Sequence, residues 1–250
     1  MKIIALGDTH GRTNWKSITA KDDFDKVIFI GDYFDSHEGV SARDQINNFK
    51  DLMAFKRSNP HKVVLLFGNH DAHYLKTFEQ KYGRYEKHHG REIQSLIHDA
   101  LDMALFKMCH VEENIVFTHA GVTKTWMKDT FLNVPDYDPQ FLESCINRKF
   151  LENPNAFKFI VKRMTYDPTG DNSWQSPIWV RPDSLRWDRL DKYIQVVGHT
   201  PQHKLNASGD IIFIDTLGTS SEYLQIVDGI FSAMESPKNK RKIKWKSANP

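Results

Sequence analysis

The sequence has few of the features that mark secreted, membrane or nucleic-acid-binding proteins. Its 250 residues include only two cysteines, Cys109 and Cys145, so no disulfide framework is expected and a reducing cytoplasm is the natural compartment. No apolar run approaches the length of a membrane span, and the first apolar run is too short for a signal peptide. The formal net charge of +2 creates no strong field toward nucleic acid or membrane. We therefore expect a cytoplasmic protein without a membrane partner.

Basic residues do gather at one place, the C-terminal stretch 238–246, which reads KNKRKIKWK. A solvated tail or a last strand is the ordinary interpretation of such a run. A nucleic-acid contact is the alternative, because a cluster of lysine and arginine can follow a phosphate backbone.

The first half of the sequence alternates strand and helix patterns. Apolar, mostly β-branched runs at 2–6, 26–30 and 62–67 each stop at a glycine, which predicts buried strands. Between the second and the third run, apolar residues recur at helical spacing over 41–57. Strand, helix and strand in this order are typical of an α/β sheet.

The second half is less regular. An apolar stripe predicts a helix over 91–107, and a strand is expected at 114–118. Prolines, polar residues and four tryptophans then interrupt any long period, which indicates an insertion of short helices and loops at about 124–189. Three later strands are expected at 193–197, 211–214 and 223–227, the last two in a second sheet. We thus predict a single domain over 1–250 that contains this Trp-rich insertion.

Side chains able to bind a metal follow five of the predicted strands. Open α/β sheets place their functional sites at the carboxyl edge of the strands, so these side chains are expected to lie at that edge. Carboxylate, amide and imidazole groups form a mixed oxygen and nitrogen set, which suits Mn²⁺, Fe²⁺, Zn²⁺ or Ni²⁺ better than a thiolate site would. The residues concerned are Asp8, His10, Asp32, Asn69, His119 and His199.

Each of these strings has an ordinary structural interpretation when it is taken alone. An Asp after a Gly is usually a turn residue, and a single His after a strand is more often packed and hydrogen-bonded than metal-bound. The strand-then-ligand arrangement occurs at five places in order along this chain. That repetition favours a metal site over coincidence.

The same strings carry a resemblance to a known family. Gly7-Asp8-Thr9-His10-Gly11, Gly31-Asp32-Tyr33-Phe34-Asp35, Gly68-Asn69-His70-Asp71, Thr118-His119-Ala120-Gly121 and Gly198-His199-Thr200-Pro201 resemble the calcineurin-type metallophosphoesterases. The likeness is greatest to the phosphoprotein-phosphatase branch, which includes bacterial and phage Ser/Thr phosphatases and symmetrical dinucleoside tetraphosphatases. Ile214-Asp215-Thr216 and Trp179-Val180-Arg181-Pro182 add to it. The resemblance implies an α/β fold, a four-layer α-β-β-α sandwich of two mixed sheets flanked by helices.

The resemblance also implies a role for each residue. Two divalent ions are expected, with Mn²⁺ as the first choice and Fe, Zn or Ni as alternatives. Asp8, His10 and Asp32 would bind the first ion; Asp32 would bridge to the second, which Asn69, His119 and His199 complete. A hydroxide bridging the ions would attack phosphorus. His70 would act as the general acid, with Asp35 orienting it and raising its pKa.

The sequence departs from this branch at its phosphate-binding arginines. The branch usually has Arg directly after the second Asp motif, where this chain has Ser36-His37, and Arg before Gly-Asn-His, where this chain has Phe67. Arg181 is expected to supply one contact with the phosphate, and His37 a second, weaker one.

The substrate is the open part of the interpretation. One hypothesis is a hydrolase of a phosphomonoester, on a protein or on a small phosphorylated molecule. Another is a hydrolase of a dinucleoside polyphosphate, or of nucleotide or nucleic-acid phosphate esters, which the missing arginines and the Trp-rich insertion favour slightly. The third is a non-catalytic metal-binding scaffold, against which the complete set of ligands argues. His203 and His73 are not assigned a role.

Overall fold

The chain folds around two mixed β-sheets. A computed structural model describes residues 1–21, 23–78, 81–131, 138–160 and 169–237. In the first sheet the strands run in the order β10-β9-β1-β2-β3-β4 and in the second β5-β6-β7-β8. The first sheet comprises β10 (Ile230–Glu235), β9 (Glu222–Val227), β1 (Lys2–Leu6), β2 (Lys26–Phe29), β3 (Val63–Leu66) and β4 (Phe106–Lys107). The second comprises β5 (Cys109–Glu112), β6 (Ile115–Thr118), β7 (Ile194–Val197) and β8 (Ile211–Phe213).

Alternation along the strands builds a core on each face of the first sheet. On β1, Ile3 and Ala5 lie in the apolar cluster between the two sheets, whereas Ile4 and Leu6 lie in the cluster that contains the flanking helices. This follows from the two-residue period of a strand, which sends successive side chains to opposite faces. The expected α/β fold of two mixed sheets flanked by helices is confirmed.

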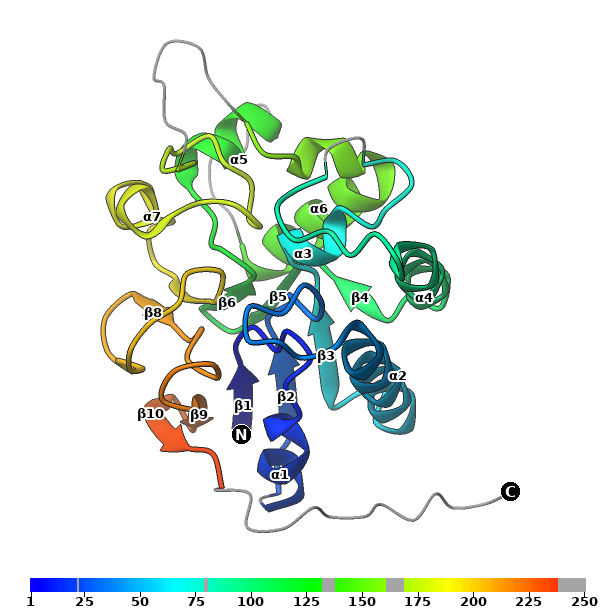
Figure 1. The fold of residues 1–250 in the computed structure, drawn as a ribbon. Coiled ribbons are helices and arrows are strands. Elements are labelled where there is room, and N and C mark those ends of the chain that lie inside the picture. Colours follow the sequence, from blue (N-terminus) through cyan, green and yellow to red (C-terminus); the bar gives the residue numbers. More distant parts are fainter. Residues whose placement is uncertain (22, 79–80, 132–137, 161–168, 238–250) are drawn as a thin grey trace.

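Helices cover the outer face of the first sheet. Besides α1 (Asn14–Lys21), they are α2 (Ala42–Ser58) and α4 (Gly90–Asp102), which lie beside each other in Figure 1. Ser41 caps α2 by accepting a hydrogen bond from the Asp44 N–H, a common way to satisfy the first turn of a helix. The apolar stripe of α2, including Phe49 and Leu52, is buried against the sheet.

The predicted helix over 91–107 ends earlier than its apolar pattern suggests. Its last residue is Asp102, and Ala104 takes a left-handed backbone conformation with φ of 53°. Phe106 and Lys107 then pair in parallel with Leu65 and Leu66 as β4. Sheet pairing and the burial that comes with it therefore outweigh the helical period at this point.

The placement of the 223–227 strand in the second sheet was wrong. It forms β9 of the first sheet, antiparallel to β1, with Ile3 opposite Ile226 and Ala5 opposite Leu224. Leu224 and Ile226 thereby join Ile3 and Ala5 in the cluster between the sheets, from the same face of the first sheet. The 211–214 strand does belong to the second sheet, as β8. A turn at Asp228-Gly229 then joins β9 to β10, a pairing that was not predicted.

The stretch 124–189 contains α5 (Lys124–Thr130), α6 (Pro139–Glu152), a 3₁₀ helix (Pro154–Phe157) and α7 (Pro182–Asp188). Figure 1 shows α5, α6 and α7 beyond the carboxyl ends of β1, β2 and β3.

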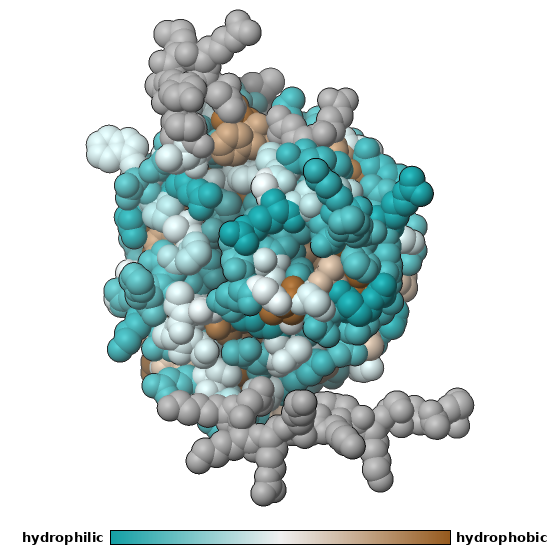
Figure 2. All heavy atoms as spheres, viewed as in Figure 1, coloured by the Kyte–Doolittle hydropathy of each residue, from teal (hydrophilic) through white to brown (hydrophobic). Residues whose placement is uncertain are grey.

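On the face shown in Figure 2, apolar side chains appear only in small, scattered patches. None of the described helices is long and apolar enough to cross a membrane. The basic stretch 238–246 lies outside the described residues.

Candidate functional site

The six predicted metal ligands converge at the carboxyl ends of five strands. Asp8 and His10 follow β1, Asp32 follows β2, Asn69 opens the short helix α3 (Asn69–Ala72) after β3, and His119 and His199 follow β6 and β7. All six side chains are buried, none more than 8% exposed. The two sheets therefore meet at this edge and enclose one polar site.

The backbone at this edge adopts conformations that non-glycine residues rarely take. The φ angles of His10, Asp32, Asp35 and His199 are 42°, 53°, 60° and 64°. Such left-handed residues cost roughly 1–3 kcal/mol each and are concentrated at functional sites. The fold thus holds these four side chains in place at a cost in stability.

Two glycines are required by close packing against the site carboxylates. A Cβ atom on Gly68 would lie 2.2 Å from Asp32 Oδ1, and one on Gly198 would lie 2.1 Å from Asp8 Oδ1. Both distances are far below van der Waals contact. The recurrence of glycine before a ligand therefore reflects, at these two positions, the space that a neighbouring carboxylate needs.

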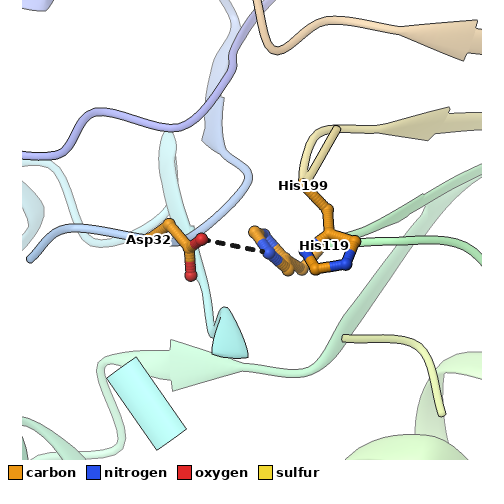
Figure 3. Close-up of side chains that lie close together, drawn as sticks. All are labelled: Asp32, His119 and His199. Carbon is orange, nitrogen blue, oxygen red and sulfur yellow. Dashed lines mark ion pairs between the residues drawn. The ribbon is translucent and has the colours of Figure 1, made fainter. Parts of the chain in front are cut away.

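The ligand atoms fall into two groups that share one residue. Asp8, His10 and Asp32 each offer an atom within 4.8 Å of the others, and Asp32, His119 and His199 do the same. Asp32 Oδ2 lies 3.4 Å from His119 Nε2 (Figure 3) and 3.8 Å from His10 Nε2. Asn69 Oδ1 lies 3.0 Å from His119 Nε2 and 2.9 Å from His199 Nδ1. Asp32 therefore lies within reach of the ligand atoms of both groups.

The electrostatics of the site fit a bound cation. Burial, and then the neighbouring Asp215, raise the pKa of Asp8 well above its usual range, and burial followed by Asp32 raises the pKa of Asp215 to about 6. Three buried carboxylates this close together are costly unless positive charge accompanies them. The pKa of His199 is held well below its usual range by burial and then Arg181, so this imidazole is neutral.

One buried nitrogen supports the same conclusion independently. His199 Nε2 is buried and has no hydrogen-bond partner among the described residues. Buried polar atoms are nearly always paired, and a neutral imidazole nitrogen is a good metal ligand. The donor set of carboxylates, one amide and imidazoles fits a borderline divalent ion.

Beside the two groups lies an aspartate that is surrounded by donors. Asp35 Oδ2 is 2.9 Å from His70 Nδ1 and 2.6 Å from His73 Nε2, and Asp35 Oδ1 accepts a 2.5 Å hydrogen bond from the Tyr74 hydroxyl. Burial lowers the pKa of His70, but Asp32 and then Asp35 outweigh burial and raise it above its ordinary value. The expected His70–Asp35 contact is present in this geometry. His73 and Tyr74, which follow His70 by three and four residues, share the aspartate with it.

Asp71 ties the ends of β2 and β3 together. Its carboxylate accepts hydrogen bonds from the backbone N–H groups of Asp32, Tyr33 and Gly68, at 2.8, 2.9 and 2.9 Å. The side chain is fully buried, and burial followed by Asp32 raises its pKa to about 7. Asp71 therefore fixes the loop that carries Asp32. Sequence reasoning gave Asp71 no role, because nothing in the string shows which amides it accepts from.

The two predicted phosphate contacts both line a cleft of about 580 Å³ above the ligands. The Arg181 guanidinium lies 3.2 Å from the Thr200 hydroxyl and 3.4 Å from the carbonyl oxygen of His199. The His37 ring lies 5.3 Å from that of His10 and 5.9 Å from that of His70. His203, which was left without a role, is exposed at the surface.

An α/β sandwich with a buried His, Asp and Asn site at its strand ends defines a class of metal-dependent hydrolases. A family model described as calcineurin-like phosphoesterase matches residues 1–203. The chain belongs to this family and is therefore a metal-dependent phosphoester hydrolase that acts on phosphorylated substrates.

Solved structures show the same fold. A cold-active protein-tyrosine phosphatase of a psychrophilic Shewanella species superimposes with a TM-score of 0.61 at 17% identity, covering 93% of this chain and 77% of its own. A protein serine/threonine phosphatase from Saccharomyces cerevisiae superimposes with a TM-score of 0.55 at 14% identity, covering 95% and 81%. No curated protein sequence matches the chain significantly.

Proposed function

We propose that the chain is a two-metal phosphoesterase that hydrolyses a phosphomonoester, on a protein or on a small phosphorylated molecule. The observation that supports this most directly is the sharing of Asp32 between two ligand groups. Paired metal sites in hydrolases lie ~3.5–4 Å apart and need such a shared carboxylate. Asp8, His10 and Asp32 would hold one ion, and Asp32, Asn69, His119 and His199 the other.

Two divalent ions at this site would lower the pKa of water to give a nucleophile at neutral pH and would neutralise charge on the phosphoryl oxygens. Mn²⁺ is the proposed metal, with Fe, Zn and Ni as alternatives, because the ligands are oxygen and nitrogen atoms without a thiolate. The buried His199 Nε2, which has no hydrogen-bond partner in the described part of the chain, supports metal binding at this position.

His70 is the proposed proton donor to the leaving oxygen. Its Nδ1 is committed to Asp35 at 2.9 Å, which leaves Nε2 for the substrate. Asp35 fixes the ring and favours the protonated form, whose pKa is raised above its ordinary value by Asp32 and then by Asp35, against the effect of burial. Arg181 and His37, which line the same cleft, would contact the phosphoryl group.

A second candidate substrate class has an observation in its favour. Tyr82, Phe159 and Trp179 line one part of the cleft, with ring centroids 4.3 Å apart for Tyr82 and Trp179 and 5.1 Å for Phe159 and Trp179. Aromatic side chains of this kind pack well against a nucleobase. Hydrolysis of a dinucleoside polyphosphate, or of a nucleotide or nucleic-acid ester, is therefore the alternative.

We propose the cytoplasm as the compartment, since Cys109 and Cys145 are both free.

A substrate panel at fixed Mn²⁺ tests the proposal. It compares p-nitrophenyl phosphate, a phosphopeptide, a dinucleoside tetraphosphate and bis-p-nitrophenyl phosphate. We expect the monoesters to have the highest kcat/KM. Preference for the tetraphosphate or the diester would favour the alternative. Hydrolysis of none of the four with any of Mn²⁺, Fe²⁺, Zn²⁺ or Ni²⁺ would leave the non-catalytic scaffold as the better description.

A further inference from the structure

Among the residues that the structure describes, three arginines line the cleft, and two of them are already engaged. Arg12 donates to Glu38 at 2.8–3.0 Å and to the carbonyl oxygens of Asp8 and Thr9. Arg181 lies 3.2 Å from the Thr200 hydroxyl, as described above. The third, Arg84, lines the cleft and has no hydrogen bond or ion pair with any residue that the structure describes. Its guanidinium is therefore available to a ligand.

Arg84 is close to the part of the site where a phosphoryl group would lie. Its positive charge lowers the pKa of His37, an effect second only to burial. The His37 ring in turn lies within 6 Å of the rings of His10 and His70, the proposed metal ligand and the proposed proton donor. Arg84 and His37 thus lie together on the His10 and His70 side of the cleft, where Arg84 supplies the positive charge, and Arg181 lines the cleft beside His199.

Arg84 belongs to a segment, residues 81–86, that is hydrogen-bonded to His73 and Tyr74 beside Asp35. Tyr82 N donates to His73 Nδ1 at 3.3 Å, and Glu86 N donates to the Tyr74 hydroxyl at 2.9 Å. The Tyr85 ring stacks on Tyr74 with centroids 4.8 Å apart. His73 and Tyr74 are the two residues that also contact Asp35.

The backbone of Arg84 is itself constrained. Its φ is 70°, in the left-handed region that favours glycine, yet the residue is an arginine. Because the segment is anchored, binding of an anion needs little further ordering of the backbone, and the entropic cost falls on the Arg84 side chain alone. Arginine also matches the phosphate group in shape, because its planar fork can donate two parallel hydrogen bonds.

We propose that Arg84 binds the phosphoryl oxygens of the substrate, in place of the arginine that this chain lacks after Asp35. The inference rests on the proposed function, since it needs a phosphorylated ligand in the cleft. It adds a substrate-binding residue that the sequence did not indicate, because Arg84 lies outside every motif and reaches the site from the segment before α4.

The experiment measures KM for p-nitrophenyl phosphate and the inhibition constant of inorganic phosphate in the full chain. Arg84→Gln is expected to raise both by about tenfold, the loss of one exposed charge-assisted contact, while kcat changes less than KM. Arg84→Lys should recover part of the affinity, because it keeps the charge and loses the fork. Both variants should melt at the wild-type temperature, since the side chain is exposed.

Lys87→Gln is the matched control, because Lys87 is exposed, carries the same charge and lies outside the cleft. It should leave both constants unchanged. Unchanged phosphate inhibition in Arg84→Gln, or an equal effect in Lys87→Gln, would overturn the proposal. Failure of the proposed function itself looks different: the wild-type chain would then hydrolyse no phosphoester at all.

Discussion

Gly198 offers a direct way to disturb one metal ligand without removing it. A Cβ atom at this position would lie 2.1 Å from Asp8 Oδ1 and 3.2 Å from Ile30 Cγ2, so the carboxylate must move by about 1 Å. The move also breaks the hydrogen bonds that the His199 N–H donates to both carboxylate oxygens at 3.1 Å. Gly198→Ala therefore displaces Asp8 and changes the position of His199 in one step.

The expected loss of activity follows from that displacement. A misplacement of about 1 Å at a reacting centre costs on the order of 10²-fold in rate. Gly198→Ala should therefore lower kcat/KM for p-nitrophenyl phosphate by ~10²-fold and weaken Mn²⁺ binding, measured by calorimetric titration of metal-free protein. The melting temperature is measured alongside, to separate loss of the site from loss of the fold.

Gly229→Ala is the control for a glycine replaced elsewhere. Gly229 has a φ of 80° and no atom within 4 Å of an added Cβ, and it lies in the β9–β10 turn away from the site. That change should cost about 1 kcal/mol in unfolding free energy and leave hydrolysis intact. A Gly198→Ala enzyme with wild-type kcat/KM and Mn²⁺ affinity would refute the argument that glycine is needed there to make room for Asp8.

Three further predictions concern side chains. His70→Ala should keep its bound metal and lose ~10²–10⁴-fold in kcat, the usual range for a proton donor; metal loss in step with rate would make His70 a ligand instead. Tyr74→Phe removes the 2.5 Å hydrogen bond to Asp35 and should lower kcat in the wild-type background. In the His70→Ala background the same change should hardly alter kcat, because Asp35 then has no proton donor to orient. Such non-additive effects on kcat would not result from a purely structural role of Tyr74. Burial raises the pKa of Glu143, but hydrogen bonds from His110 and Lys107 outweigh it and bring the pKa from 4.5 to about 2. The ionised Glu143 carboxylate therefore stabilises the fold above about pH 4.5, and this contribution is lost as the pH falls toward 2. In urea unfolding at neutral pH, Glu143→Gln should be less stable than the wild type by on the order of 1 kcal/mol. The difference in unfolding free energy between the two proteins should shrink as the pH is lowered.

The fold was predictable where burial leaves a strong pattern. The strands β1, β2 and β3 are buried runs of apolar residues that each end near a glycine, so composition alone locates them. β4 has only two residues and follows directly on a helical pattern, and β5 carries the polar residues His110 and Glu112, so neither has a strand signature. The sheet to which β9 belongs depends on pairing with residues more than 200 positions away, which no local pattern records.

The site was predictable to the extent that its side chains follow strands. The candidate ligands stand at strand ends, and the topology brings strand ends together. The residues that were missed act through long-range contacts: Tyr74 reaches Asp35 across 39 positions, and Asp71 accepts from Asp32 across the same span. Arg84 comes from a segment that contains none of the motifs on which the candidate site was based. Such roles depend on three-dimensional proximity and leave no spacing signal in the sequence.

The central claim is a two-metal site with Asp32 shared between the ions. Its most direct test is the Mn²⁺ stoichiometry of metal-free wild-type and Asp32→Ala protein, measured by calorimetry together with hydrolysis of p-nitrophenyl phosphate. We predict two equivalents and metal-dependent turnover for the wild type, and for Asp32→Ala the loss of tight binding at both positions and of turnover. A wild-type chain that hydrolyses equally well without metal, or an Asp32→Ala variant that binds two ions and turns over normally, would contradict the account.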